Sequence, residues 1–143
     1  MPEIEKSAAS LHVWGDEVIP DEITRLLGVS PTRSHLKGDI VSARADQVFR
    51  RKSGSWSLRA TDREPEDLDG QIQELLSRTT ADLAVWQELA HRFDLVMFCG
   101  LFMRSWNDGM MLSPTTLKLL ADRGLSLSLD IYGPDDEEEK ATP

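Results

Sequence analysis

The residues best able to do chemistry lie in a polar, basic stretch between positions 32 and 52. Its hydroxyl-bearing and cationic members, with one glycine among them, are Thr32, Arg33, Ser34, His35, Lys37, Gly38, Arg44, Arg50, Arg51 and Lys52. Cations and hydroxyls on a pliable backbone can bind a phosphate or a carboxylate. The glycine and lysine spacing of a P-loop is absent. The stretch therefore predicts either a site for a small anion or a solvated loop whose charges balance an acidic remainder.

The charge of the chain is divided between this region and the rest. The formal net charge is −9, but residues 33–63 carry eight Lys or Arg and three Asp or Glu, a net charge of +5. The other residues carry a net charge of −14. Nucleic-acid binding requires a positive surface, so we expect no nucleic-acid partner. A small anionic ligand or a protein partner is retained as a candidate.

A second group of candidates comes from segments in which apolar and polar residues alternate, namely 10–16, 56–60 and 125–132. This alternation is typical of strands with one face in the core. The positions expected on the opposite face are His12, Trp14, Ser57, Arg59, Ser128, Asp130 and Tyr132. Trp, Tyr and Arg are enriched at interfaces, so this face is either a binding surface or an ordinary solvated sheet face.

Combining both groups gives a set of candidate binding residues and no catalytic set. The binding set is Trp14, Arg33, His35, Lys37, Trp56, Arg59, Asp130 and Tyr132. The three histidines, His12, His35 and His91, lack metal-ligand spacing, so we expect neither a metal nor a cofactor. Cys99 lies in an apolar run, where a buried thiol behaves as a small hydrophobe. Asp130 could act as a general base, but pairing with a cation such as Arg59 is the simpler expectation.

The elements that must position these residues predict an α+β fold. Pro20 and Gly28 bound one predicted helix, residues 66–92 predict a helical pair, and Ser113-Pro114 opens another helix that ends at Gly124. The apolar run 95–103 predicts a central strand covered on both faces. Residues 110–112 predict a short returning strand, and residues 30–52 a loop with a short strand near 39–43.

We therefore expect a two-layer sandwich: a mainly antiparallel sheet with helices on one face, built from two β-α-β-like halves joined by the helical pair. The expected domain spans residues 9–133, between a flexible N-terminus (1–8) and a disordered acidic tail (134–143). One cysteine, no signal peptide and no apolar run of about 20 residues indicate a cytoplasmic protein with no membrane contact.

The order of several short motifs resembles a known bacterial family. The motifs are Trp14-Gly15-Asp16, Pro20-Asp21-Glu22-Ile23, Leu27-Gly28, Pro31-Thr32-Arg33, Lys37-Gly38, Gly54-Ser55-Trp56-Ser57-Leu58 and Leu127-Ser128-Leu129-Asp130-Ile131-Tyr132. Over residues 10–133 the chain is similar to the domain of unknown function 4279 family. The resemblance implies a bacterial origin and a compact α+β fold, and it implies no activity.

The sequence favours a non-enzymatic binding or interaction protein. One version is an immunity-type protein, because an acidic domain complements a basic toxin. The alternative is an enzyme for a small phosphorylated or carboxylated substrate, with Arg33, Lys37 and Arg59 holding the anion and His12, His35 or Asp130 moving protons. A homodimer assembled through the sheet is a third reading.

Overall fold

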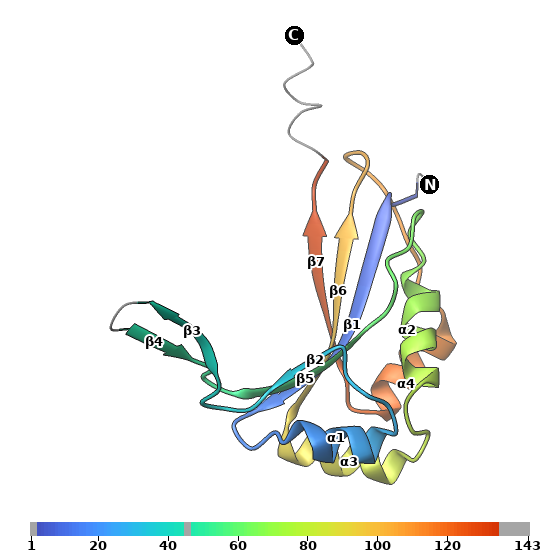
Figure 1. Cartoon of the computed structure of the whole chain (residues 1–143). Helices are drawn as coiled ribbons and strands as arrows, with labels where there is room; N and C mark the ends of the chain where they lie inside the picture. Colours follow the sequence, from blue (N-terminus) through green and yellow to red (C-terminus); the bar gives the residue numbers. More distant parts are fainter. Residues whose placement is uncertain (1–2, 45–46, 135–143) are drawn as a thin grey trace.

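The computed structural model describes residues 3–44 and 47–134 and folds them into two layers, a sheet and a set of helices (Figure 1). The elements, in chain order, are β1 (Lys6–Gly15), α1 (Pro20–Leu27), β2 (Arg33–His35), β3 (Ile40–Arg44), β4 (Gln47–Arg50), β5 (Gly54–Arg59), α2 (Leu68–Ser77), α3 (Leu83–Arg92), β6 (Asp94–Phe102), α4 (Pro114–Asp122) and β7 (Ser126–Tyr132). The predicted α+β sandwich with helices on one face of a mainly antiparallel sheet is confirmed.

The sheet has the strand order β2-β5-β1-β6-β7, and β1 lies at its centre. Its pairings are antiparallel except that of β6 with β7. The segment β6-α4-β7 is therefore a β-α-β unit with adjacent strands. In β1-α1-β2 the two strands are also parallel, because both are antiparallel to β5, which lies between them. These are the two predicted halves, and α2 and α3 form the helical pair between them.

The helix ends follow from local chemistry. Gly28 adopts a left-handed conformation, with φ of 80°, after the last turn of α1, and its N–H donates to the Thr24 carbonyl. The side chain of Ser113 accepts a hydrogen bond from the Thr116 N–H at the start of α4. Both ends match the sequence prediction. None of the described helices is long and apolar enough to cross a membrane.

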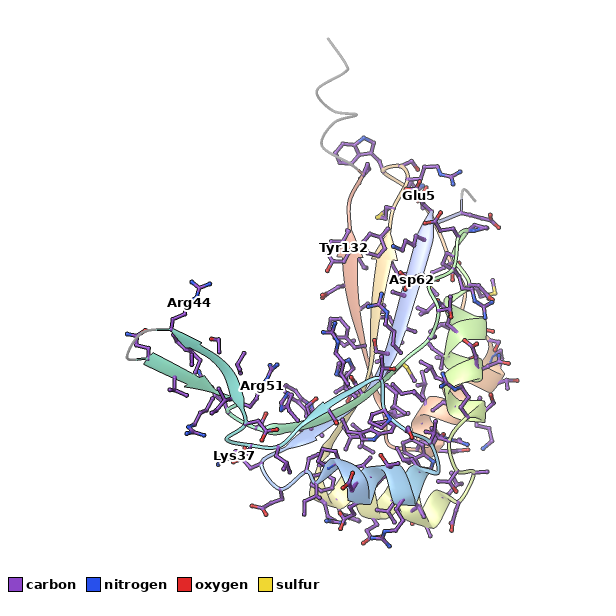
Figure 2. The ribbon with its side chains drawn as sticks, viewed as in Figure 1. Glu5, Lys37, Arg44, Arg51, Asp62 and Tyr132 are labelled. Atoms are coloured by element: carbon purple, nitrogen blue, oxygen red, sulfur yellow. The ribbon has the colours of Figure 1, made fainter. Side chains whose placement is uncertain are left out.

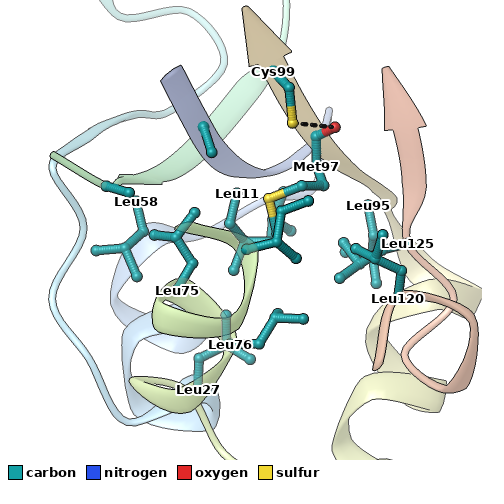
Figure 3. Close-up of a cluster of buried hydrophobic side chains, with 14 of the residues drawn as sticks. Leu11, Leu27, Leu58, Leu75, Leu76, Leu95, Met97, Cys99, Leu120 and Leu125 are labelled. Atoms are coloured by element: carbon teal, nitrogen blue, oxygen red, sulfur yellow. Dashed lines mark hydrogen bonds between the residues drawn. The ribbon is translucent and has the colours of Figure 1, made fainter. Parts of the chain in front are cut away.

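The core lies between the helices and one face of the sheet (Figure 3). Leu11 of β1, Leu58 of β5 and Met97 of β6 stand side by side in the sheet register and meet Leu75 of α2. These side chains are at most 1% exposed. Removing them from water is the main source of the free energy of folding.

Three strand predictions need correction. Strand β1 begins at Lys6, so residues 6–8 are not part of a flexible end. The signal was missed because a buried serine, Ser7, occupies a core position, where its hydroxyl donates to Gln71 Oε1 at 2.6 Å. No strand forms at 110–112, and the nearest pairing is a single bridge between Glu3 and Gly109, just before this segment. The stretch 30–52, expected to be a loop with one short strand near 39–43, contains three strands, β2, β3 and β4, of which β3 corresponds to the predicted one.

Strands β6 and β7 also differ from expectation. β6 is not covered on both faces, since Phe98 is 40% exposed on the side without helices. β7 alternates as predicted, but it is an edge strand, and Leu129 and Ile131 are exposed beyond the reach of the helices. Apart from Pro134, the predicted acidic tail (134–143) lies outside the described residues.

Candidate binding surface

The face of the sheet opposite the helices has no described helix over it, and every strand of the sheet contributes to it (Figure 1). We call it the open face. By strand register its residues are Lys6, Ala8, Ser10, His12 and Trp14 from β1; Arg33 and His35 from β2; Ser55, Ser57 and Arg59 from β5; Asp94, Val96, Phe98, Gly100 and Phe102 from β6; and Ser126, Ser128, Asp130 and Tyr132 from β7.

The sequence pattern placed side chains on this face correctly. All seven positions predicted to point away from the core do so in the register. Two members of the basic stretch join them, because Arg33 pairs with Ser57 and His35 pairs with Ser55. His35 also helps to line a hollow of about 250 Å³ beside the start of α1.

A hollow of about 460 Å³ lies on the open face, over β1, β6 and β7. Its lining is His12, Trp14, Val96, Phe98, Ser126 and Ser128. The small serines of β7 leave space beside the large rings of β1 and β6. The His12 ring meets Phe98 edge-on, with the ring centroids 5.8 Å apart. Burial lowers the pKa of His12, so the ring favours its neutral form, which both donates and accepts hydrogen bonds.

A smaller hollow of about 200 Å³ adjoins the first one across Phe98. Its lining is Ala8, Ser10, Arg59, Phe98, Gly100, Phe102 and Tyr132. Gly100 forms the floor, and an added Cβ there would lie 3.5 Å from the Phe102 ring. The Phe102 and Tyr132 rings are stacked with centroids 4.8 Å apart, and Lys6 Nζ lies 5.1 Å from the Phe102 centroid. The open face thus combines aromatic rings on β1, β6 and β7 with two hollows and with the cations Lys6 and Arg59 beside the smaller one.

Arg59 pairs with Asp62 rather than with Asp130, which corrects the sequence expectation. A guanidinium nitrogen of Arg59 lies 3.0 Å from Asp62, and Lys6 Nζ lies 3.2 Å from the same carboxylate. The hydrogen bond from Arg59 is the main cause that lowers the pKa of Asp62. Asp130 is three strands away from Arg59, about 14 Å at the usual strand spacing.

The hairpin of β3 and β4 projects from the sheet on the side away from the helices (Figure 1). We call residues 40–50 the arm. At its base the Arg51 N–H donates to the Asp39 carbonyl at 2.7 Å, and the Gly38 N–H donates to the Arg51 carbonyl at 2.9 Å. Lys37 is held beside the base by an ion pair of 3.1 Å with Asp16. The arm therefore leaves the body on a paired, two-stranded stem.

The arm combines exposed apolar side chains with cations. Ile40, Val41, Val48 and Phe49 are each between 50% and 60% exposed. Ala43 pairs with Val48 on one face of the arm and Ser42 pairs with Phe49 on the other, so exposed apolar side chains lie on both faces. Figure 2 shows Arg44 near the tip and Arg51 near the base. Neither forms an ion pair with another described residue.

Trp56 does not belong to the surface, although the sequence set included it. Its ring is fully buried against α1, and its indole N–H donates to the Thr24 hydroxyl at 3.1 Å. The register pairs it with Val13 on the core face of β1. The alternation already contained this information, because Trp56 shares its side of the strand with the apolar Leu58.

The residues required for acid–base chemistry on an anion are spread across the sheet. Arg33 lies on β2 and Asp130 on β7, four strand spacings or about 19 Å apart, whereas Arg33 and His12 flank Ser57 in the register, two spacings or about 10 Å apart. Cys99 is buried in the core as predicted, and burial raises the pKa of its thiol to about 12. Within residues 3–44 and 47–134, no three His, Cys, Asp or Glu side chains are grouped so that they could hold a metal ion.

Sequence reasoning missed the apolar members of the surface. Val96, Phe98 and Phe102 were assigned to a strand buried on both sides, and the arm, apart from the short strand predicted near 39–43, to a polar loop. A usable signal existed in the second case: the pairs Ile40-Val41 and Val48-Phe49 are separated by a short polar segment, as in a hairpin.

Fold and surface together define an α+β protein with one aromatic, uncovered sheet face and a basic hairpin arm. The family model described as a domain of unknown function (DUF4279) matches residues 4–134, nearly the whole chain. The chain belongs to this family. No curated protein and no solved structure gave a significant match.

Proposed function

We propose that this protein is a non-enzymatic binding module that binds an acidic protein partner through its open face and its arm. The main support for this proposal is the exposed apolar surface of the arm. A two-stranded hairpin on its own is marginally stable in water, and this one exposes four large apolar side chains. Contiguous exposed apolar surface marks interaction sites on soluble proteins. A bound partner would cover these side chains.

The sign of the charge identifies the kind of partner. On the open face, the arm and its base the described cations are Lys6, Arg33, Lys37, Arg44, Arg50, Arg51, Lys52 and Arg59. The described acids there are Asp39, Asp94 and Asp130, while Lys37 pairs with Asp16 and both Lys6 and Arg59 pair with Asp62. The surplus of positive charge therefore lies at Arg33 and along the arm and its base, at Arg44, Arg50, Arg51 and Lys52. Complementary potentials steer association and suppress wrong partners, so this surface fits an acidic partner. An immunity-type role is compatible with this proposal when the toxin presents an acidic region to the arm.

The aromatic rings supply the second element of recognition. Trp14, Phe98 and Tyr132 are each at least 40% exposed, and the two hollows lie between them. Aromatic side chains that fill or line pockets contribute most of the binding energy at many interfaces. An apolar side chain of the partner fits the larger hollow, where the neutral His12 offers a hydrogen bond.

No observation favours the enzyme reading to the same degree. The cations that would hold a small anion lie on separate elements, and two of them, Lys37 and Arg59, pair with Asp16 and Asp62. The groups that would move protons are distributed from β2 to β7. We therefore base the proposal on binding alone.

Partner capture from an extract of the producing cells tests the proposal. The double variants Trp14→Ala/Arg33→Ala, on the open face, and Val48→Asp/Phe49→Asp, on the arm, replace exposed side chains. Leu117→Asp is the matched control, because Leu117 is 50% exposed on α4, on the helical side. We expect the control to retain the captured protein, and each double variant to bind the purified partner more than about tenfold less tightly. Undiminished binding by both double variants would overturn the proposal.

A further inference from the structure

The outer edge of β7 is an unpaired strand edge that lacks the usual protection. β7 is the last strand of the sheet, and no described strand pairs with its outer side. Natural edge strands are commonly blunted by lysine, proline or a bulge. The seven residues of β7 contain one charged side chain, Asp130, and neither lysine nor proline, and their register with β6 is unbroken. Leu129 is 43% exposed and Ile131 is 59% exposed.

The direction of the backbone groups on this edge follows from one hydrogen bond. The Tyr132 carbonyl accepts from the Met103 N–H at 2.9 Å, so it faces β6. Along a strand, successive residues direct their N–H and C=O groups to opposite sides. Leu127, Leu129 and Ile131 therefore present their backbone groups to the outside. An added antiparallel strand would bond to these three residues.

We propose that the partner of this edge is a second copy of the chain, with β7 antiparallel to β7 around a two-fold axis at Leu129. This register pairs Leu129 with its own copy and Leu127 with Ile131. Every outward N–H and C=O of the strand then has a partner. The apolar side chains meet on the helical side, and Ser128 faces Asp130 on the open face, where the hydroxyl can donate to the carboxylate.

Neighbouring registers fit less well. Moving the axis to Asp130 brings the two Asp130 carboxylates together, which is repulsive. Moving it to Ser128 leaves Ile131 beyond the partner strand. The self-complementary register is the one expected of an isologous two-fold interface, in which the same surface is used twice.

The dimer would leave the proposed partner surface accessible. Edge pairing extends the sheet, so the open faces of both copies become one continuous surface. The arm follows β2, which is at the opposite edge of the sheet from β7. Dimerisation and partner binding are therefore separable.

Sedimentation velocity of the full chain tests the proposal. We expect the wild type to sediment at about twice the 16.1 kDa mass of one chain. The double variant Leu129→Lys/Ile131→Lys places like charges across the axis and is expected at the mass of one chain. Leu117→Lys, equally exposed but on α4, is the control and remains dimeric. Circular dichroism confirms that each variant is folded.

Hydrogen exchange on the wild type gives a second measurement that needs no variant. We expect the amides of Leu127, Leu129 and Ile131 to exchange slowly in concentrated solution and rapidly on dilution. The amides of Ser128 and Asp130, which face β6, should not respond to dilution. A wild type that stays monomeric, or a lysine variant that stays dimeric, overturns the proposal. The arm variant Val48→Asp/Phe49→Asp should remain dimeric, so a failure of partner binding would not be mistaken for a failure of dimerisation.

Discussion

The protonation state of His12, and with it the charge at the centre of the open face, depends on pH. Its ring stands between the polar β5 and the aromatic part of the sheet, edge-on to Phe98. The ring is partly withdrawn from water without a carboxylate partner, and burial lowers its pKa below the ordinary value of 6.5. Protonation of His12 is therefore expected to lower the free energy of unfolding and to place a charge on the open face.

This shift predicts that acid weakens the fold through His12. The unfolded chain takes up a proton at His12 near pH 6.5, and the folded chain does so only at lower pH. The contribution is complete above pH 6.5 and is lost as the pH falls below it. We expect the free energy of unfolding to fall less between about pH 7 and about pH 5 in His12→Gln than in the wild type. Urea unfolding at both pH values measures it.

The wild-type histidines His35 and His91 remain in the His12→Gln variant, so their contributions cancel in the comparison. Equal pH dependence in both proteins would show that charging His12 costs the folded state nothing.

At the level of elements, the junction of β5 with the loop before α1 depends on Gly54. A Cβ at this position would lie 2.7 Å from the Val18 carbonyl oxygen and 3.0 Å from that of Gly15. Both atoms belong to the backbone, so the loop would have to move. The close approach holds the entry to α1 against the strand that continues from the arm.

We therefore expect Gly54→Ala to lower the free energy of unfolding by about 1–3 kcal/mol. The matched control is Gly133→Ala, where no heavy atom lies within 4 Å of the added carbon, and we expect almost no change. Urea denaturation of both variants makes the comparison. If the two variants had similar free energies of unfolding, the loop before α1 would be able to move aside without destabilising the fold.

The sequence predicted elements well where local chemistry decides them and poorly where neighbours decide them. Gly28 and Ser113 bound helices through their own backbone and side chain, and alternation placed His12 and Asp130 on the correct face. Whether Phe98 is covered depends on which face of the sheet carries helices, and local sequence does not contain that information. The same is true of Ile131, whose exposure results from the edge position of β7.

At the scale of the molecule, the arm and the body form separate units. β3 pairs with β4, and neither strand joins the five-stranded sheet. The stem closes below them with the hydrogen bond between Arg51 and Asp39. The described residues of the arm, 40–44 and 47–50, contribute nothing to the core of the body, since none of them is among its buried residues.

Replacing residues 40–50 by an Asn-Gly turn should therefore leave the body folded. That dipeptide suits the tight turn required between Asp39 and Arg51. We expect the midpoint of thermal unfolding to stay close to that of the wild type, and the variant to lose the partner captured by the intact chain. Calorimetry and the capture experiment measure the two effects. A strong loss of thermal stability would show that the arm is part of the cooperative unit.

The central place of β1 has a consequence for the order in which the molecule can assemble. β1 comes near the start of the described chain, yet its partners are β5 and β6, and Lys6 pairs with Phe102. During synthesis, the central strand β1 leaves the ribosome first. Its neighbour β6 follows only after β2 to β5, α2 and α3 have been made. Pairings this distant in sequence carry a large loop-closure entropy and slow folding. Until β6 has been synthesised, the backbone groups on one edge of β1 lack their partner strand. The sheet is therefore completed late in the synthesis of the chain.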